Sequence, residues 1–341
     1  MRAAPPPPLE AMAIVISRAL LRQQVVYASV CKDWQATAAR SMRSHLDFRG
    51  GAVPLRAVCL LAATVEWKQI SIGVENVGAA PRPAVYHRVV DALNKWSRRR
   101  GGAGSSQARL VLDLDDVQVT WTSKWDLEPL MPCVRTINVC SNSLAALRWA
   151  VHAEEVVVSH APMGAAMDAM PPGVTSVEFF ACGKRHLTSA HLQRWLAACK
   201  AQEYSFAAMA LTNAELVAIA DAMAPHWRTL AITHNPPRAE RGIRAIAHAL
   251  RTHEGMREFT VSHTAYRTPV LMDIVNSAQR VWHLDISHCA VDPAAVDRIM
   301  ARLMRYPALG VVTAEGNPGC KELFDKYVLA EGAGGDVMVW A

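Results

Sequence analysis

The chain has 341 residues, of which 51% are hydrophobic and 19% are charged, and its formal net charge at pH 7 is +6. This composition excludes a disordered chain and allows one large solenoid or two ordinary domains with a substantial buried core. Most lysines and arginines stand singly among apolar residues, as on solvated helix faces, so the positive charge does not indicate nucleic acid as a partner.

The cysteine spacing and the hydropathy indicate the cell compartment of the protein. Eight cysteines stand at irregular spacings without a C-x-x-C pair. They fit neither a zinc site nor a disulfide framework and are interpreted as reduced core thiols of an intracellular protein. No run of 18 apolar residues free of charge occurs, so no membrane helix is expected. The sequence thus predicts a cytoplasmic protein without membrane contact, with the nucleus as an alternative.

Residues 1–45 predict a compact helical domain. Four consecutive prolines at positions 5–8 form a stiff lead-in. Helical patterns follow over residues 9–19, 20–34 and 36–43. Residues 11–27 are apolar and carry two arginines but no acid, which also allows a mitochondrial presequence. The same block continues to Trp34 without a cleavage-like boundary, and this favours a folded domain.

The motif at the end of this block, Val30-Cys31-Lys32-Asp33-Trp34, looks like the V-C-K-x-W signature of F-box domains. Together with Pro8-Leu9-Glu10 near the start, the block resembles an F-box. The resemblance implies that the domain docks on the Skp-type adaptor of a Cullin-RING ubiquitin ligase. An alternative is that the helices only cap the first edge of the following repeats. The residues that the resemblance assigns to adaptor binding are Pro8, Leu9, Ile14, Leu20, Val30, Cys31 and Trp34.

Short strands are expected next, at irregular spacing. The first candidate, Ile70/Ile72, is separated from the second by a helix expected over residues 84–96 and by a Gly/Ser loop. From Leu112 onward the strand starts are 25, 19 and 21 residues apart. Such short units predict a short and irregular convex side. The candidates are Ile70/Ile72, Leu112/Leu114, Ile137/Val139 and Val156/Val158.

From residue 174 to residue 318 a regular repeat appears. Its strand half has the form apolar-x-apolar-x-x-(Cys/Asn/Thr)-x-apolar, and the best copy begins at Leu284. The strand starts differ by 27, 26, 29, 25 and 28 residues. This is the period of leucine-rich repeats. The starts are Val177, Tyr204, Leu230, Phe259, Leu284 and Val312.

The second half of each repeat predicts a helix, because apolar residues recur at i, i+3, i+4 and i+7. The offset from strand start to helix start is 12 residues in three repeats and 13 in a fourth. Thr212 with Glu215 predicts a capping box, while Thr268-Pro269 and Asp292-Pro293 each predict a capping oxygen before a proline. The helical stripes are Leu192/Trp195/Leu196/Cys199, Leu216/Ile219/Ala220/Met223, Ile243/Ile246/Ala247/Leu250, Leu271/Ile274/Val275/Ala278 and Val296/Ile299/Met300/Leu303.

This pattern resembles leucine-rich repeats of the ribonuclease-inhibitor and F-box-associated kind. The resemblance implies an α/β solenoid with parallel strands on its concave face and helices on its convex face. One repeat cannot bury its own apolar side, whereas stacked repeats share a continuous core. The expected organisation is an F-box-like helical domain over residues 1–45, the solenoid over 46–330 and a tail over 331–341.

The x positions of the strands are expected to face the concave side, where they form a small, polar surface of mixed charge. The pair Ser/Thr-His recurs there, and His234, His263 and His288 come from successive repeats, so their rings should lie about 5 Å apart. Such a row could sense pH or hold a metal ion. Alternatively, each histidine bonds a neighbouring carbonyl at a position that tolerates any polar residue. The predicted partner-binding residues are Glu178, Phe180, Thr233, His234, Ser262, His263, Asp285, Ser287 and His288.

Motifs for catalysis or phosphate binding are absent from the sequence, including G-x-S-x-G, H-E-x-x-H and G-x-G-x-x-G. We therefore expect no catalytic residue, cofactor or metal site. The sequence predicts the substrate-recognition subunit of an SCF-type Cullin-RING ubiquitin ligase, with a protein substrate that it does not identify. The alternative is a non-enzymatic leucine-rich-repeat scaffold or assembly subunit.

Overall fold

A computed structural model describes residues 45–47, 69–73, 109–114, 134–237, 239–318 and 338–340. The chain divides into two compact units, residues 1–153 and 154–341. The helical domain predicted over residues 1–45 lies outside the described residues except for its last position, and so do all its predicted adaptor contacts. The helix predicted over residues 84–96 lies outside them as well.

The described residues of the first unit form four parallel strands, β1 (His45–Asp47), β2 (Gln69–Gly73), β3 (Arg109–Leu114) and β4 (Val134–Val139), which pair in chain order. The predicted strand residues Ile72, Leu112 and Ile137 lie in register with one another. After β4 the chain forms only a short 3₁₀ helix, Leu144–Arg148. The expected short convex side is therefore confirmed in this repeat.

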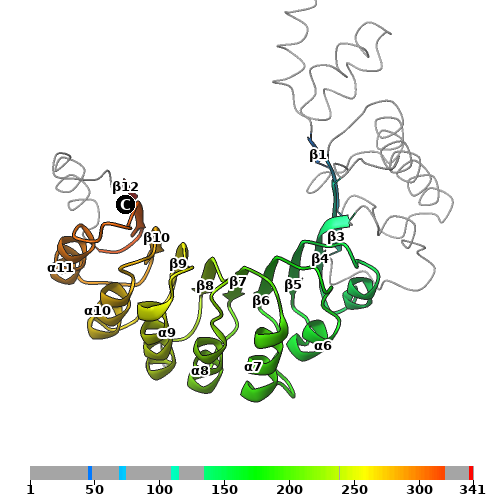
Figure 1. Cartoon of the computed structure of the whole chain (residues 1–341), viewed down its shortest axis with the longest axis horizontal. Coiled ribbons are helices and arrows are strands. Elements are labelled where there is room, and N and C mark those ends of the chain that lie inside the picture. The colour runs from blue at the N-terminus through cyan, green and yellow to red at the C-terminus, as the bar shows by residue number, and fades with distance from the viewer. Residues whose placement is uncertain are drawn as a thin grey trace, which may run out of the picture. The chain divides into compact units, whose positions relative to one another are not determined.

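The second unit alternates strands with helices, and its helices cover one side of the strand ladder (Figure 1). Consecutive strands pair in parallel throughout. A strand, β12, pairs with β11 inside the segment predicted as a tail. The strands are β5 (Glu155–Ser159), β6 (Ser176–Phe180), β7 (Glu203–Ala207), β8 (Thr229–Thr233), β9 (Glu258–Thr260), β10 (His283–Asp285), β11 (Val311–Thr313) and β12 (Met338–Trp340). The helices are α6 (Met163–Asp168), α7 (Ser189–Ala198), α8 (Asn213–Ala222), α9 (Glu240–Thr252), α10 (Thr268–Ser277) and α11 (Pro293–Leu303).

The strand register confirms the predicted repeat. The six predicted strand starts are direct Cα partners along the ladder, from Val177 to Val312. All six side chains are buried. The differences in repeat length therefore lie in the connections, and they leave the register of the core positions unchanged. This arrangement confirms an α/β leucine-rich-repeat solenoid.

The core of the second unit lies between the strands and the helices and contains an aromatic cluster at its centre. The Phe179 and Phe206 rings stack with centroids 5.9 Å apart, and the Tyr204 and Trp227 rings lie 4.2 Å apart. Trp195 of α7 contacts both Phe179 and Tyr204 edge-on. Residues from two successive repeats thus pack as one cluster, which stabilises the interface between these repeats.

Buried polar side chains follow the strands at the predicted Cys/Asn/Thr position. Asn235 Oδ1 accepts a hydrogen bond from the Leu211 amide at 3.1 Å, and Asn235 Nδ2 donates to the carbonyls of Phe206 and Thr233 at 3.0 and 2.9 Å. These bonds give backbone groups at the turn after the strand a buried side-chain partner, and the Thr233 carbonyl also accepts from the Ala208 amide. Asn317 bridges repeats in the same way, because its Oδ1 accepts from the Cys289 amide at 2.8 Å.

Cysteines occupy the same position in other repeats. The Cys289 thiol donates to the Val261 carbonyl at 3.0 Å, and burial raises the pKa of that thiol to about 12. Cys182 donates to the Val158 carbonyl at 3.2 Å. Cys140, Cys182, Cys199 and Cys289 are free thiols. Three of them are buried as predicted for core thiols, whereas Cys199 is partly exposed.

Two of the three predicted helix caps are confirmed. Thr212 and Glu215 form the capping box of α8, and the Asp292 carboxylate accepts from the Ala295 amide at 2.9 Å. The prediction for Thr268 is wrong, because Thr268 is the first residue of α10 and Arg267 occupies the cap position. The Thr268 hydroxyl instead donates to the Asp292 carboxylate of the next repeat at 3.3 Å. The Thr268 hydroxyl thus bonds to a charged acceptor of the neighbouring repeat, and α10 has no side-chain cap.

Candidate functional site

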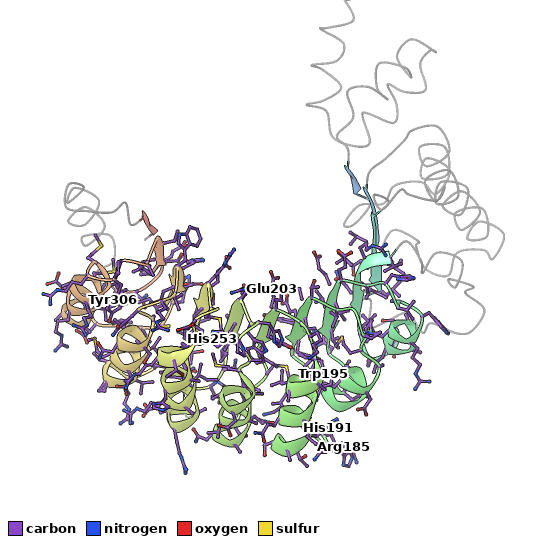
Figure 2. All side chains as sticks on the ribbon, viewed as in Figure 1. Arg185, His191, Trp195, Glu203, His253 and Tyr306 are labelled. Carbon is purple, nitrogen blue, oxygen red and sulfur yellow. The ribbon has the colours of Figure 1, made fainter. Side chains whose placement is uncertain are left out.

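The candidate site is the strand side of the second unit that faces away from the helices, which we call the strand face. Side chains alternate along each strand, so the residues on either side of a buried core position point to this face. Figure 2 shows Glu203 on this side and Trp195 on the helix side. Three rows of side chains from β5–β11 and the positions just after them form the strand face. They are Glu155, Ser176, Glu203, Thr229, Glu258, His283 and Val311; Val157, Glu178, Ser205, Ala231, Thr260, Asp285 and Thr313; and Ser159, Phe180, Ala207, Thr233, Ser262, Ser287 and Glu315.

The formal charges on the strand face are all negative. Its first two rows contain five acidic residues, and none of β5–β11 contains a lysine or an arginine. For β5–β11 the expectation of mixed charge is therefore wrong. Each strand contributes at most one acid, so the sequence of a single repeat shows no excess of negative charge. The parallel register, however, places the five acids on one surface. The acids are Glu155, Glu178, Glu203, Glu258 and Asp285.

The predicted partner-binding residues divide into exposed and buried groups. Phe180 is 41% exposed, and Glu178, Thr233 and Asp285 are partly exposed. Ser262 and Ser287 are buried, which corrects their assignment as accessible contacts. Their carbonyl oxygens accept the amides of His234 and His263, so these serines belong to the backbone ladder. Glu203 and Glu258, which were not among the predicted contacts, precede the first buried residue of their strands.

The recurring histidines occupy a special backbone position. The residue after the third row has a positive φ in every repeat from β5 to β11. Left-handed backbone is uncommon for residues with a Cβ, and histidine is among the types enriched there. The residue choice at this position is therefore restricted by conformation. The residues are His160, Ala181, Ala208, His234, His263, His288 and Gly316.

His234, His263 and His288 form a stack of exposed rings, which we call the histidine row. The ring centroids of His234 and His263 lie 4.1 Å apart at 11°, and those of His263 and His288 lie 4.3 Å apart at 14°. The predicted row is confirmed, with a spacing tighter than expected. It ends at Gly316, where a Cβ would lie 2.1 Å from the His288 ring.

The stacked geometry argues against two roles considered for the histidine row, which are metal binding and bonding to a neighbouring carbonyl. Parallel rings direct their in-plane lone pairs side by side and not toward one point, so they do not favour a shared metal ion. Within the described part of the chain no group of three His, Cys, Asp or Glu residues is arranged to hold a metal. None of the three rings hydrogen-bonds to a described carbonyl, so the carbonyl-bonding alternative is not supported. The three rings contact one another.

The stack lowers the pKa of the central His263 below its ordinary value of 6.5. Partial burial between two rings is the main cause, followed by repulsion from His234 and His288, and Asp285 and Glu315 act in the opposite direction. The folded state therefore binds a proton at His263 less readily than the unfolded state does. The stability that follows from this difference is present above the unfolded pKa and is lost as the pH falls through the folded one.

We expect acidification to destabilise the wild-type protein more than a His263→Asn variant, in which asparagine tolerates the left-handed backbone. Urea unfolding between about pH 8 and about pH 5 measures this difference. Equal pH dependence of the two proteins would contradict the role assigned to His263.

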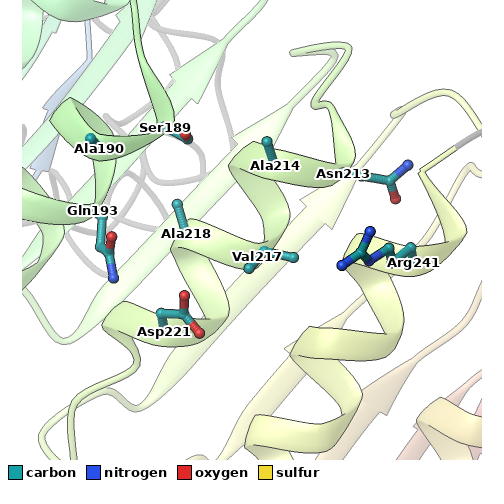
Figure 3. Close-up of a pocket in the computed structure, with 9 residues that line it drawn as sticks. All are labelled: Ser189, Ala190, Gln193, Asn213, Ala214, Val217, Ala218, Asp221 and Arg241. Atoms are coloured by element: carbon teal, nitrogen blue, oxygen red, sulfur yellow. The ribbon is translucent and has the colours of Figure 1, made fainter.

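A hollow of about 440 Å³ lies on the opposite, helical side, between α7 and α8 with the start of α9 at its end (Figure 3). Alanine and valine side chains form much of its lining, and Asp221 and Arg241 are its only charged lining residues. Asn213 at its edge is already engaged, because its Oδ1 accepts the Gly242 amide at 2.7 Å. The hollow thus brings no group of catalytic side chains together.

The repeat period, the parallel register and the buried Asn/Cys positions define a leucine-rich-repeat solenoid. No family model matches the sequence, and no curated protein matches it. The fold is similar to that in the crystal structure of the yeast Rad7 and Elc1 complex, with a TM-score of 0.50, 11% identity and coverage of 91% of this chain and 88% of that chain. The leucine-rich-repeat-containing protein LegL7 from Legionella pneumophila gives a TM-score of 0.44 at 10% identity, with coverage of 76% and 96%. Among the described residues no helix is long and apolar enough to cross a membrane.

Proposed function

We propose that this protein is a non-enzymatic recognition subunit that binds a partner protein on its strand face. The observation that carries the proposal is the rigid ladder of β5–β11 with exposed acids on its open side. Glu178, Glu203 and Glu258 form no ion pair with any described residue, so their charges are available to a partner. A preorganised surface of this kind binds without the entropic cost of ordering loops.

We further propose that the N-terminal helical block docks on a Skp-type adaptor of a Cullin-RING ubiquitin ligase, which would make the solenoid a substrate receptor. The support is the V-C-K-x-W motif at Val30–Trp34 and its position directly before the repeats. Rad7, whose fold is similar, was crystallised in a complex with Elc1. The alternative remains a scaffold whose N-terminal helices only cap the solenoid.

Co-purification of the full-length chain with a Skp-type adaptor tests this proposal. We expect the wild-type protein to retain the adaptor and a Val30→Asp/Trp34→Ala variant to lose it, because a buried charge and a lost aromatic anchor each remove at least about 2 kcal/mol of binding free energy. Glu258→Gln, on the strand face, is the matched control and should retain the adaptor. Circular dichroism establishes that each variant is folded.

If the intact protein does not bind the adaptor, or if the double variant binds it as well as the wild type does, the ligase proposal is wrong. In that case the scaffold alternative is favoured, and the assignment of the strand face still stands.

A further inference from the structure

We infer that the strand face binds a lysine- or arginine-rich segment of a partner protein, and that protonation of the histidine row weakens this binding. The inference deepens the proposed function and rests on its assignment of recognition to the strand face. It does not depend on the adaptor.

The charge of the strand face is complementary to that of a basic ligand. The whole chain carries a formal net charge of +6, yet β5–β11 carry five acids and no lysine or arginine. Glu315, directly after β11, adds a further exposed acid. Charges of one sign on a concave surface raise the local concentration of the opposite charge and disfavour partners of the same sign. A basic segment is therefore favoured over an acidic segment or a nucleic acid.

Few cations beside the strand face can offset its acids. Lys184 Nζ lies 2.7 Å from the buried Glu215 carboxylate, and Arg267 pairs with Glu240. Arg228, directly before β8, donates to the neutral Gly255 carbonyl at 2.9 Å and keeps its charge, and Arg257, directly before β9, is exposed. Two cations do not balance the five acids of the strands and Glu315, so the strand face keeps a net negative charge.

The histidine row borders the acids of the strand face. His234, His263 and His288 follow the third row of the strand face, and Asp285 and Glu315 act on His263 electrostatically. Histidine is the side-chain type that gains a positive charge between about pH 8 and about pH 5, so acidification in that range adds positive charge to the row beside the acids. A basic ligand is then repelled.

The width of the strand face sets the length of the peptide that is used as a probe. Seven neighbouring strands at about 4.8 Å span about 29 Å, which an extended peptide of about ten residues matches. We propose to titrate the full-length chain with a fluorescent peptide of alternating lysine and serine by fluorescence anisotropy, at low salt and about pH 7.5. An alternating glutamate–serine peptide and a single-stranded oligonucleotide of similar length serve as the competing ligand classes.

We expect the lysine peptide to bind at least about tenfold more tightly than either competitor. A triple variant, Glu178→Gln/Glu203→Gln/Glu258→Gln, should weaken its binding by about tenfold, because each exposed charge pair contributes a factor of about 1.5–5. Asp221→Asn, which removes an exposed acid on α8, is the control and should leave binding unchanged. Equal binding of the three ligands, tighter binding of the oligonucleotide, or full affinity in the triple variant would overturn the inference.

The histidine row is tested by lowering the pH to about 5.5. We expect the wild-type protein to lose about five- to tenfold in affinity for the lysine peptide, and a His234→Asn/His263→Asn/His288→Asn variant to lose less than twofold. Asparagine is chosen because it accepts the left-handed backbone at these positions. A folded triple-asparagine variant with the same pH dependence as the wild type would refute the part assigned to the histidines. Adaptor co-purification is a separate measurement, so its failure is distinguishable from failure of peptide binding.

Discussion

Trp227→Ala is expected to lower the free energy of unfolding of the second unit by about 3–5 kcal/mol. The Trp227 side chain is 0% exposed and belongs to the largest fully buried side chains of the described residues. Its ring lies 4.2 Å from that of Tyr204, and Tyr204 in turn contacts Trp195. Truncation therefore removes both the buried area and the ring that packs against Tyr204, the residue that contacts Trp195 of the preceding repeat. The loss is a large part of the 5–15 kcal/mol that is typical of a folded domain.

Urea unfolding followed by far-UV circular dichroism measures this effect. Trp282→Ala is the matched control, because Trp282 is 50% exposed and its truncation should cost under about 1 kcal/mol. Trp227→Phe keeps an aromatic ring but removes the indole N–H, which has no partner among the described residues. Keeping a ring should limit the loss to under about 2 kcal/mol. If Trp227→Ala is no more damaging than Trp282→Ala, the aromatic cluster does not hold the repeats together.

Asn235→Leu is expected to cost about 2–4 kcal/mol, although leucine is similar in size and more apolar. The Asn235 amide group accepts from one backbone amide and donates to two carbonyls in a buried environment. Leucine leaves the Leu211 amide without its acceptor, and an unpaired buried donor costs more than the hydrophobic gain returns. The same unfolding measurement applies.

Two further variants make this prediction specific. Asn235→Asp keeps an acceptor for the Leu211 amide but places an oxygen against two carbonyls, so it should also be destabilising. Gln193→Leu replaces an exposed amide on α7 and should change the stability by no more than about 0.5 kcal/mol. Stability of Asn235→Leu equal to the wild type would mean that the buried amide is not needed at the turn.

Much of the repeat was predictable because its signals are local. The spacing of Leu230, Ile232 and Asn235 already contains the alternation of a strand and the polar residue of the turn. The capping box of Thr212 and Glu215 needs only residues of one helix end. The prediction of a cap at Thr268 was wrong, and the Thr268 hydroxyl donates instead to a carboxylate in the next repeat. A pattern confined to one repeat does not contain that partner.

The candidate site was predictable only in part. The histidine row followed from equal positions in successive repeats, but the face-to-face stacking and the end of the row at Gly316 required coordinates. The burial of Ser262 and Ser287 followed from the ladder that passes through their carbonyls. The charge of the strand face was missed because Glu203 and Glu258 stand before the strand core, outside the motif that defined the repeat.

By itself, the sequence determined the period, the order of strand and helix, and the buried positions of each repeat, because these depend on contacts within about a dozen residues. The tertiary structure decided which side chains lie beside one another across repeats. Residues 25–29 positions apart in the chain become lateral neighbours about 4.8 Å apart, and this register depends on every connection between them. Acids scattered one to a strand thereby form a single negative surface beside the stacked imidazoles.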